Sequence, residues 1–216
     1  MINKQTALKN NIDSIIFDLD GTLWDSTATV AKAWQSAIDK VDFVNETITQ
    51  AKVRSITGMA YDAIYLKLYP NLSQEQRNLL MRICGEEELA YIQSEGGVLY
   101  SGLVETLTYL KEKYALFIVS NCQSGYIEAF LENYQLHRFF SDQECYGNTN
   151  QPKASNIRAV IERNSLKAPV YVGDTMGDYQ ASQGAKVPFI YTTFGFGEVP
   201  EADAVINQFS DLAKLL

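Results

Sequence analysis

The sequence predicts a doubly wound, Rossmann-like α/β core with a parallel sheet, into which a small all-helical cap domain is inserted. Runs rich in β-branched and aromatic residues recur along the chain, at residues 14–17, 115–120, 170–173, 189–193 and 204–206. The later runs alternate with helical patterns, and such alternation is typical of a parallel sheet covered on both faces. Residues 25 to about 95 interrupt it with four helical segments. We therefore expect a core domain of residues 1–23 and 97–216 and a cap domain of residues 24–96.

The first two helical segments of the insertion follow the first strand closely. Apolar residues recur at helical spacing in the first segment, namely Val30, Trp34, Ile38 and Val41. Asp25 or Ser26 precedes this helix, and we interpret Asp25 as a helix cap rather than as a third catalytic acid. A second segment begins near Glu46 and stops at Gly58, because glycine commonly ends helices.

The last two helical segments lead back to the core. A third helix is expected to end at Tyr69-Pro70, since proline cannot continue a helix. A fourth begins at Ser73, where a glutamine three residues later gives the spacing of a capping box. The run Glu86-Glu87-Glu88 is interpreted as the solvated face of this helix. Gly96-Gly97 follows it, and these glycines together with Gly21 are expected to form a hinge.

Three helices of the core are predicted from apolar residues that share a face. These residues are Leu103, Leu107 and Leu110; Ile127, Phe130, Leu131 and Tyr134; and Ile157, Val160 and Ile161. Together with the apolar runs, they give the alternation of strands and helices that a doubly wound sheet requires.

Composition excludes several classes of partner. The chain has 216 residues with 18 basic and 26 acidic side chains, and its net charge of -8 argues against nucleic acid while leaving a small phosphorylated ligand possible. No apolar run reaches the length of a membrane span, and residues 1–11 lack the apolar stretch of a signal peptide. Cys84, Cys122 and Cys145 form no C-x-x-C pair, which favours reduced thiols over disulfides or structural zinc. A cytoplasmic protein is expected.

Two acids stand at the end of the first predicted strand. Because side chains alternate across a strand, Asp18 and Asp20 face the same side, roughly 7 Å apart. At that distance two carboxylates repel by about 2 kcal/mol at an effective dielectric near 20. A bound cation or a shared proton would offset this cost, whereas an isolated D-x-D-G segment is also consistent with a simple polar turn.

Further polar groups follow other predicted strands. Ser120-Asn121 ends one strand, and Gly173-Asp174-Thr175 ends another, with Asp178 four residues after Asp174. In an open α/β sheet, ligands bind beyond the carboxyl ends of the strands. Lys153 stands where a helix begins, a position at which a positive charge opposes the helix dipole, so a functional anion would explain it.

These residues resemble the four motifs of the haloacid dehalogenase superfamily of phosphohydrolases. The motifs occur in order as DLDGT at 18–22, IVSN at 118–121, the single Lys153 and GDTMGD at 173–178. The inserted helices resemble the small helical cap of that family, and the ending at 194–212 resembles phosphoglycolate-phosphatase-type members. Within it, the segment FGFGE is expected to be a loop at the edge of the site.

The resemblance implies a mechanism and a metal. Asp18 would be the nucleophile that forms an aspartyl-phosphate, and Asp20 would protonate the leaving group and later deprotonate water. Mg²⁺ would be held by Asp18, the backbone carbonyl of Asp20 and Asp174, with Asp178 nearby or bound through water. The expected substrate is a small phosphorylated metabolite.

The resemblance also implies a binding site for the phosphoryl group. Ser120 and the backbone around Asn121 would bind its oxygens, and Lys153 would link it to the nucleophile. Gly21 and Thr22, next to the two acids, are assigned to phosphate binding as well.

Three readings of this site stay open. They do not include a dehalogenase, which would lack the second acid, or an ion pump, which would have transmembrane spans. A magnesium-dependent phosphatase is favoured, and a phosphomutase of the β-phosphoglucomutase type is the first alternative. A catalytically silent phosphate-binding module is the second.

Substrate identity is expected to depend on the cap. In resembling proteins the loop around Gly58-Met59 and the nearby Arg54 face the site, where Arg54 either grips a substrate carboxylate or only decorates a helix. His137 is interpreted as structural, and Cys122 as a small packing residue. The sequence does not define an oligomeric state.

Overall fold

A six-stranded parallel sheet forms the centre of the protein. The computed structural model describes residues 12–216. Residues 1–11 lie outside the described part of the chain. They include the start of the predicted core segment 1–23 and the stretch in which no signal peptide is predicted. The strand order is β5-β4-β1-β6-β7-β8. Their bounds are β1 Ser14–Phe17, β4 Ala115–Ser120, β5 Asp142–Cys145, β6 Pro169–Gly173, β7 Phe189–Thr192 and β8 Ala204–Ile206. The predicted α/β class is confirmed.

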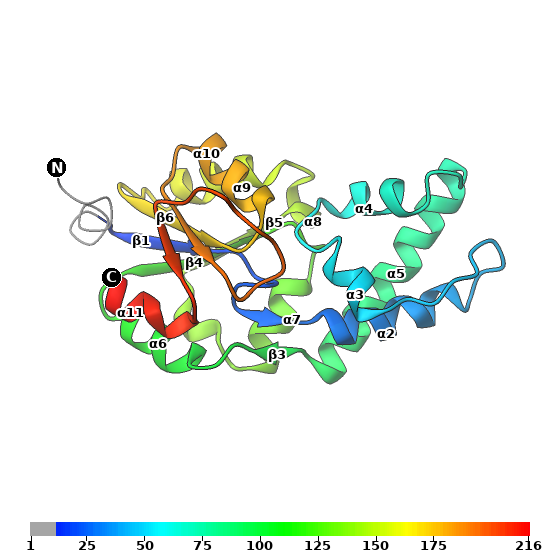
Figure 1. Ribbon diagram of the computed structural model, residues 1–216, viewed down its shortest axis with the longest axis horizontal. Coiled ribbons are helices and arrows are strands. Elements are labelled where there is room, and N and C mark those ends of the chain that lie inside the picture. The colour runs from blue at the N-terminus through cyan, green and yellow to red at the C-terminus, as the bar shows by residue number, and fades with distance from the viewer. Residues whose placement is uncertain (1–11) are drawn as a thin grey trace.

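Helices cover both faces of this sheet (Figure 1). On one face lie α9 (Lys153–Arg163) and α10 (Met176–Ala185), and on the other α6 (Leu103–Lys111), α7 (Tyr126–Asn133) and α11 (Leu212–Leu215). The strand β1 shows why both faces are needed, since Ile15 and Phe17 belong to one buried apolar cluster and Ile16 to another. The short helix α8 (Tyr146–Thr149) follows β5.

Four helices lie between β1 and α6 and extend to one side of the sheet (Figure 1). They are α2 (Thr27–Ile38), α3 (Gln50–Arg54), α4 (Tyr61–Leu68) and α5 (Gln74–Glu95). Ser73 and Gln76 form the expected capping box before α5. Ser26 is the N-cap residue of α2, while the Asp25 carboxylate accepts the Thr27 N–H, so Asp25 caps this helix as expected. The division into domains at residues 24–96 stays a prediction.

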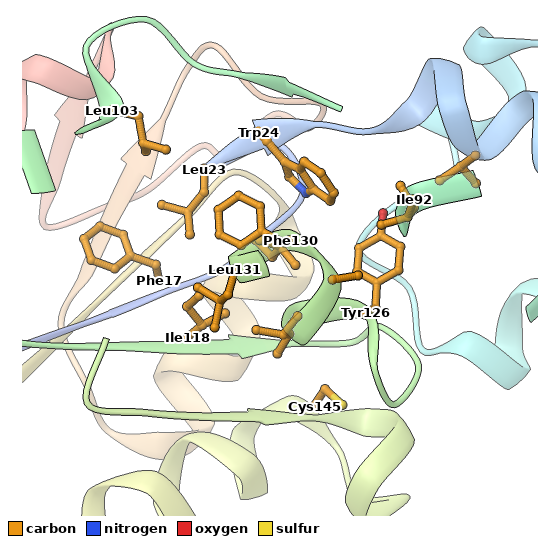
Figure 2. Close-up of a cluster of buried hydrophobic side chains, with 14 of the residues drawn as sticks. Phe17, Leu23, Trp24, Ile92, Leu103, Ile118, Tyr126, Phe130, Leu131 and Cys145 are labelled. Carbon is orange, nitrogen blue, oxygen red and sulfur yellow. The ribbon is translucent and has the colours of Figure 1, made fainter. Parts of the chain in front are cut away.

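Aromatic packing joins the helical segment to the core. The chain leaves and re-enters the core through a two-stranded antiparallel ribbon of β2 (Trp24–Asp25) and β3 (Val98–Leu99). Figure 2 shows Trp24 beside Phe130 and Tyr126, with ring centroids 4.9 Å and 5.8 Å from that of Trp24. This cluster fixes the position of the segment between β1 and α2, which also contains Asp20.

Three local features differ from the sequence prediction. The strand β5 and the β2–β3 ribbon were not predicted, because β5 is polar and the ribbon has only two residues in each strand. Glu88 was assigned to a solvated face, and this is wrong, because its side chain is 6% exposed and accepts a hydrogen bond of 2.6 Å from Trp34 Nε1. That partner satisfies a carboxylate that burial would otherwise destabilise.

Two expectations from composition concern the surroundings of the protein. Within residues 12–216, no helix combines the length and the apolar character that crossing a bilayer requires. All three cysteines are free, with Cys84 and Cys145 buried and Cys122 half-buried.

Candidate active site

The polar groups predicted at strand ends lie together at the carboxyl edge of the sheet. Asp18 directly follows β1, and its N–H donates to the Val172 carbonyl of β6 at 2.8 Å. Ser120 is the last residue of β4, and Asp174 directly follows β6. Since β1 lies between β4 and β6, these three side chains come from neighbouring strands.

Lys153 is buried between two carboxylates at the first residue of α9. Its Nζ donates to Asp18 Oδ1 and to Asp178 Oδ1, both at 2.7 Å. Burial alone would lower the pKa of Lys153, but the charges of Asp178 and Asp18 outweigh this effect and raise it. These two charges also explain why a lysine is tolerated at the start of a helix.

Lys153→Met is expected to lower the free energy of unfolding by about 3 to 5 kcal/mol, because it leaves two buried carboxylates without their cation. Urea denaturation with EDTA present measures this loss without compensation by a metal. The matched control is Lys32→Met, which breaks an ion pair with Glu95 between side chains that are 61% and 41% exposed. It should cost about 1 kcal/mol or less. Equal losses in the two variants would contradict the assigned role of Lys153.

Asp18, Asp174 and Asp178 form a buried carboxylate cluster. Each offers an oxygen, and these oxygens lie within 4.8 Å of one another. Asp174 Oδ2 accepts the Phe196 N–H at 2.6 Å, while Asp174 Oδ1 is buried with no hydrogen-bond partner among residues 12–216. Burial and then the charges of Asp178 and Asp18 hold the pKa of Asp174 well above its usual range. An oxygen-only donor set with one unpartnered buried oxygen fits a hard divalent cation.

Two glycines make room for Asp174. A Cβ atom at Gly21, where φ is +84°, would lie 2.1 Å from Asp174 Oδ2, and one at Gly195 would lie 2.3 Å from the same atom. Gly195 belongs to the FGFGE segment, so the expected loop at the edge of the site is where the structure places it. The Gly21 N–H donates to the Trp24 carbonyl at 2.9 Å, and Thr22 is fully buried. This geometry gives Gly21 and Thr22 a part in the turn, and their assignment to phosphate binding stays a prediction.

Asp178 is held on both of its oxygens. Oδ2 accepts from the Thr175 N–H at 3.0 Å and from the Thr175 hydroxyl at 2.6 Å, which forms a capping box at the start of α10. Oδ1 accepts from Lys153 and, at 3.2 Å, from the Tyr171 hydroxyl. Burial raises the pKa of Asp178, but the charge and hydrogen bond of Lys153 and the bonds to Thr175 outweigh it, so the net shift is downward.

Asp20 lies in different surroundings from Asp18. It follows the end of β1, and its Oδ1 accepts from the Ser26 hydroxyl at 2.5 Å and from the Tyr126 hydroxyl at 3.2 Å. Burial raises the pKa of Asp20 to about 6, although the hydrogen bonds from Ser26 and Tyr126 oppose the shift. A carboxyl group with such a pKa exchanges protons near neutral pH, as a general acid and base must. The side chain of Asp20 is not part of the carboxylate cluster found among residues 12–216.

A cavity lies between the sheet edge and the inserted helices. It contains about 550 Å³ of empty space, its open mouth included. Asp18, Asp20, Ser120 and Asn121 line its core side, and the Gly58-Met59 loop lines its helical side, as expected. The two sides are joined by a hydrogen bond of 2.8 Å from Asn121 Nδ2 to the Gly58 carbonyl.

The inserted helices supply one further charged residue to this cavity. Glu88 lines it from α5, together with Trp34 of α2. Burial raises the pKa of Glu88 to about 7, the hydrogen bond from Trp34 opposes the rise, and the charge of Asp20 adds to it. Neither Glu88 nor Tyr126 was predicted as a site residue.

Arg54 is turned to other partners. Its guanidinium pairs with Asp25 and lies over the ring of Phe196, 5.3 Å from the centroid. It is not among the described residues that line the cavity. Arg54 therefore links α3 to the 194–198 loop, and its assignment to substrate binding stays a prediction. His137 is exposed in the 3₁₀ turn His137–Phe139, and Cys122 lines the cavity beside Asn121.

The fold is a doubly wound α/β sheet with an inserted helical segment. Clustered carboxylates and a buried lysine lie at the carboxyl edge of the sheet and face that segment. This arrangement is typical of an α/β enzyme with a covered acidic site. The chain belongs to the haloacid dehalogenase-like hydrolases, because the model of that family matches residues 15–192. The family expected from the sequence motifs is confirmed, and with it a hydrolytic enzyme.

Relatives of the chain match it over nearly its full length. It is 29% identical to a phosphoglycolate phosphatase of Agrobacterium fabrum, over 93% of this chain and 91% of that protein. It is also 29% identical to a phosphoglycolate phosphatase of Aliivibrio fischeri, over 95% of each. The structure of a haloacid dehalogenase-like hydrolase from Streptococcus pneumoniae matches with a TM-score of 0.82 at 21% identity, over 94% of this chain and 97% of that one. This last likeness supports the fold alone.

Proposed function

We propose that the protein is a cytoplasmic phosphatase that hydrolyses a small phosphate monoester through an aspartyl-phosphate, with Mg²⁺ as cofactor. The observation that supports it most is the placement of Asp18, which lines the cavity and accepts a hydrogen bond from buried Lys153. Asp18 also shares the carboxylate cluster with Asp174, one of whose oxygens is buried without a hydrogen-bond partner among residues 12–216. The curated relatives are named as phosphoglycolate phosphatases, so phosphoglycolate is the first substrate to test.

In the first step Asp18 acts as the nucleophile. A carboxylate oxygen of Asp18 attacks phosphorus, an O–P bond forms, and the bond from phosphorus to the ester oxygen breaks. The departing alkoxide takes the proton of Asp20, whose pKa of about 6 leaves a useful protonated fraction near neutral pH. Ser26 and Tyr126 hold the Asp20 carboxyl in place through their hydroxyls.

In the second step Asp20 acts as the base. It takes a proton from a water molecule that attacks the same phosphorus atom, and the bond between phosphorus and the Asp18 oxygen breaks. Inorganic phosphate leaves, Asp18 is again a carboxylate, and Asp20 is again protonated. The net change is one ester and one water converted to one alcohol and one phosphate.

The cation would be held by Asp18 and Asp174, with the Asp20 carbonyl as a further ligand and Asp178 close by. When bound, Mg²⁺ supplies positive charge that stabilises negative charge on the phosphoryl oxygens and offsets the repulsion within the carboxylate cluster. Lys153 keeps Asp18 oriented and adds positive charge at the same place. Ser120 and the backbone at Asn121 lie at the end of β4, where they would bind phosphoryl oxygens.

Removal of metal is expected to abolish hydrolysis of p-nitrophenyl phosphate, and added Mg²⁺ should restore it. Binding of Mg²⁺ should also raise the melting temperature, because it relieves the repulsion among the buried carboxylates, which adds to burial in raising the pKa of Asp174. Asp174→Asn should lose most of this thermal shift. Asp203→Asn should keep it, because the Asp203 carboxylate accepts the Phe189 N–H at 2.9 Å, at the amino end of β7 and away from the carboxyl edge of the sheet. Full activity after exhaustive chelation would contradict the metal assignment.

Release of inorganic phosphate, measured with p-nitrophenyl phosphate and with sugar monophosphates, separates the phosphatase from its alternatives. A phosphomutase would pass the phosphoryl group to a sugar hydroxyl, so a sugar monophosphate would be isomerised with little release of inorganic phosphate. A silent binding module would turn over no phosphoester at all.

A further inference from the structure

The wall of the cavity formed by the inserted segment is largely apolar and carries one buried carboxyl group. The hydroxyl groups of Thr57 and Tyr61 in this wall donate to the backbone carbonyls of Val53 and Met81. Val53, Ile56 and Ile64 from the inserted helices form much of this wall. Glu88 stands among them on α5, and its Oε2 accepts the Trp34 N–H at 2.6 Å. Trp34 is itself 3% exposed, so Glu88 is held in a fixed place and does not reach out to solvent.

This wall offers no positive charge. Among residues 12–216, no lysine, arginine or histidine lines the cavity. The nearest cation considered for substrate binding, Arg54, is paired with Asp25 and stacked on Phe196. Lys153, the buried cation of the site, is occupied by Asp18 and Asp178.

A substrate places its phosphoryl group at Asp18, so its organic part must lie toward this wall. A carboxylate there would lose water without gaining a cation, which is among the costliest kinds of burial. Neither protonation state of Glu88 provides a positive charge, and its ionised state repels a second carboxylate. A hydroxyl or ammonium group, in contrast, can donate a hydrogen bond to the Glu88 carboxyl, and the apolar walls strengthen that bond.

We propose that Glu88 is a specificity-determining residue that selects phosphate monoesters whose organic part ends in a hydrogen-bond donor, an amine or a hydroxyl, over esters that end in a carboxylate. This inference rests on the proposed phosphatase activity and concerns only the organic part of the substrate. It separates this chain from the substrate named for its curated relatives, which carries a carboxylate.

The test is a series of two-carbon phosphate esters that differ at the far end. Phosphoethanolamine, 2-hydroxyethyl phosphate, ethyl phosphate and phosphoglycolate offer an ammonium, a hydroxyl, a methyl and a carboxylate group, respectively. We expect kcat/KM for the first two to exceed that for phosphoglycolate by at least about tenfold, as for a site built to bind a donor. The kcat/KM for ethyl phosphate should lie between the values for the two donor esters and the value for phosphoglycolate, because the methyl group neither donates to Glu88 nor repels it.

Glu88→Gln tests whether Glu88 causes the ranking. Glutamine can still accept the Trp34 N–H but carries no negative charge, so the ratio of kcat/KM between phosphoethanolamine and phosphoglycolate should fall at least about fivefold. The matched control is Glu87→Gln on the same helix. Glu87 binds Lys40 and, at 2.8 Å, Ser36 outside the cavity, so this variant should keep the parent ratio.

The outcomes distinguish this inference from the proposed function. If p-nitrophenyl phosphate is hydrolysed but phosphoglycolate is the best of the four esters, the inference is wrong and the proposed function stands. An unchanged ratio in a folded Glu88→Gln variant would also overturn the assignment to Glu88. If Glu88→Gln fails to fold, the ranking by the parent protein still decides. If p-nitrophenyl phosphate is not hydrolysed with Mg²⁺, the proposed function fails and this inference fails with it.

Discussion

Asp18→Asn is expected to lower kcat by on the order of 10⁴-fold or more and to abolish the phosphoenzyme, as loss of a nucleophile does in other covalent mechanisms. An amide cannot form the acyl phosphate, and it also removes one charge from the proposed metal site. The substituted asparagine would keep nearly the volume of the parent side chain and an oxygen that can accept from Lys153, whose partner Asp178 remains. The fold is therefore expected to survive, so loss of activity would report on chemistry.

Acid quenching after mixing with a ³²P-labelled ester measures the phosphoenzyme directly. The parent protein should retain label on the chain, and Asp18→Asn should retain none. The matched control is Asp13→Asn, because Asp13 lies just before β1, at the opposite end from Asp18, and is exposed. It should label and turn over like the parent. Label retained by Asp18→Asn at the parent level would show that another residue is the nucleophile.

The central strands could be predicted because each is a run of consecutive, mostly apolar residues. Residues 14–17 and 115–120 are apolar apart from one terminal serine in each, and they form β1 and β4 with the predicted bounds. The strand β5 has the sequence Asp-Gln-Glu-Cys and lies at the edge of the sheet, where one side needs no apolar cover. Its acids are neutralised by Arg163 of α9, a contact between segments about twenty residues apart that local pattern does not contain.

The same distinction separates the predicted from the missed residues of the site. Asp18, Asp174 and Lys153 follow strands or start a helix, so the position of each at the carboxyl edge could be inferred from the order of elements. Glu88 could not be placed in this way, because its burial depends on Trp34, which lies 54 residues earlier on a different helix. In a run of three glutamates, only packing of α5 on α2 determines which one faces inward. The role of Arg54 was likewise unpredictable, since its partner Phe196 comes from the far end of the chain.

Asp20→Ala is expected to separate the two chemical steps. Nitrophenolate leaves with little protonation, so the first step with p-nitrophenyl phosphate should proceed without Asp20. The attack of water on the aspartyl-phosphate still needs a base, so the second step should slow by about 10²- to 10⁴-fold, the usual contribution of general catalysis. The Ser26 and Tyr126 hydroxyls, which are 2.8 Å apart, can still bond to each other, which limits damage to the site.

Rapid mixing of Asp20→Ala with p-nitrophenyl phosphate should therefore show a burst of nitrophenolate close to one equivalent per active site, followed by slow turnover. An alkyl phosphate should show no burst, because its poor leaving group needs the missing proton. The companion variant Asp20→Asn keeps an acceptor for Ser26 and Tyr126 but cannot exchange a proton, so it should give the same burst. If both variants hydrolyse both esters at the parent rate, Asp20 is neither acid nor base, and its pKa near 6 is a consequence of burial alone.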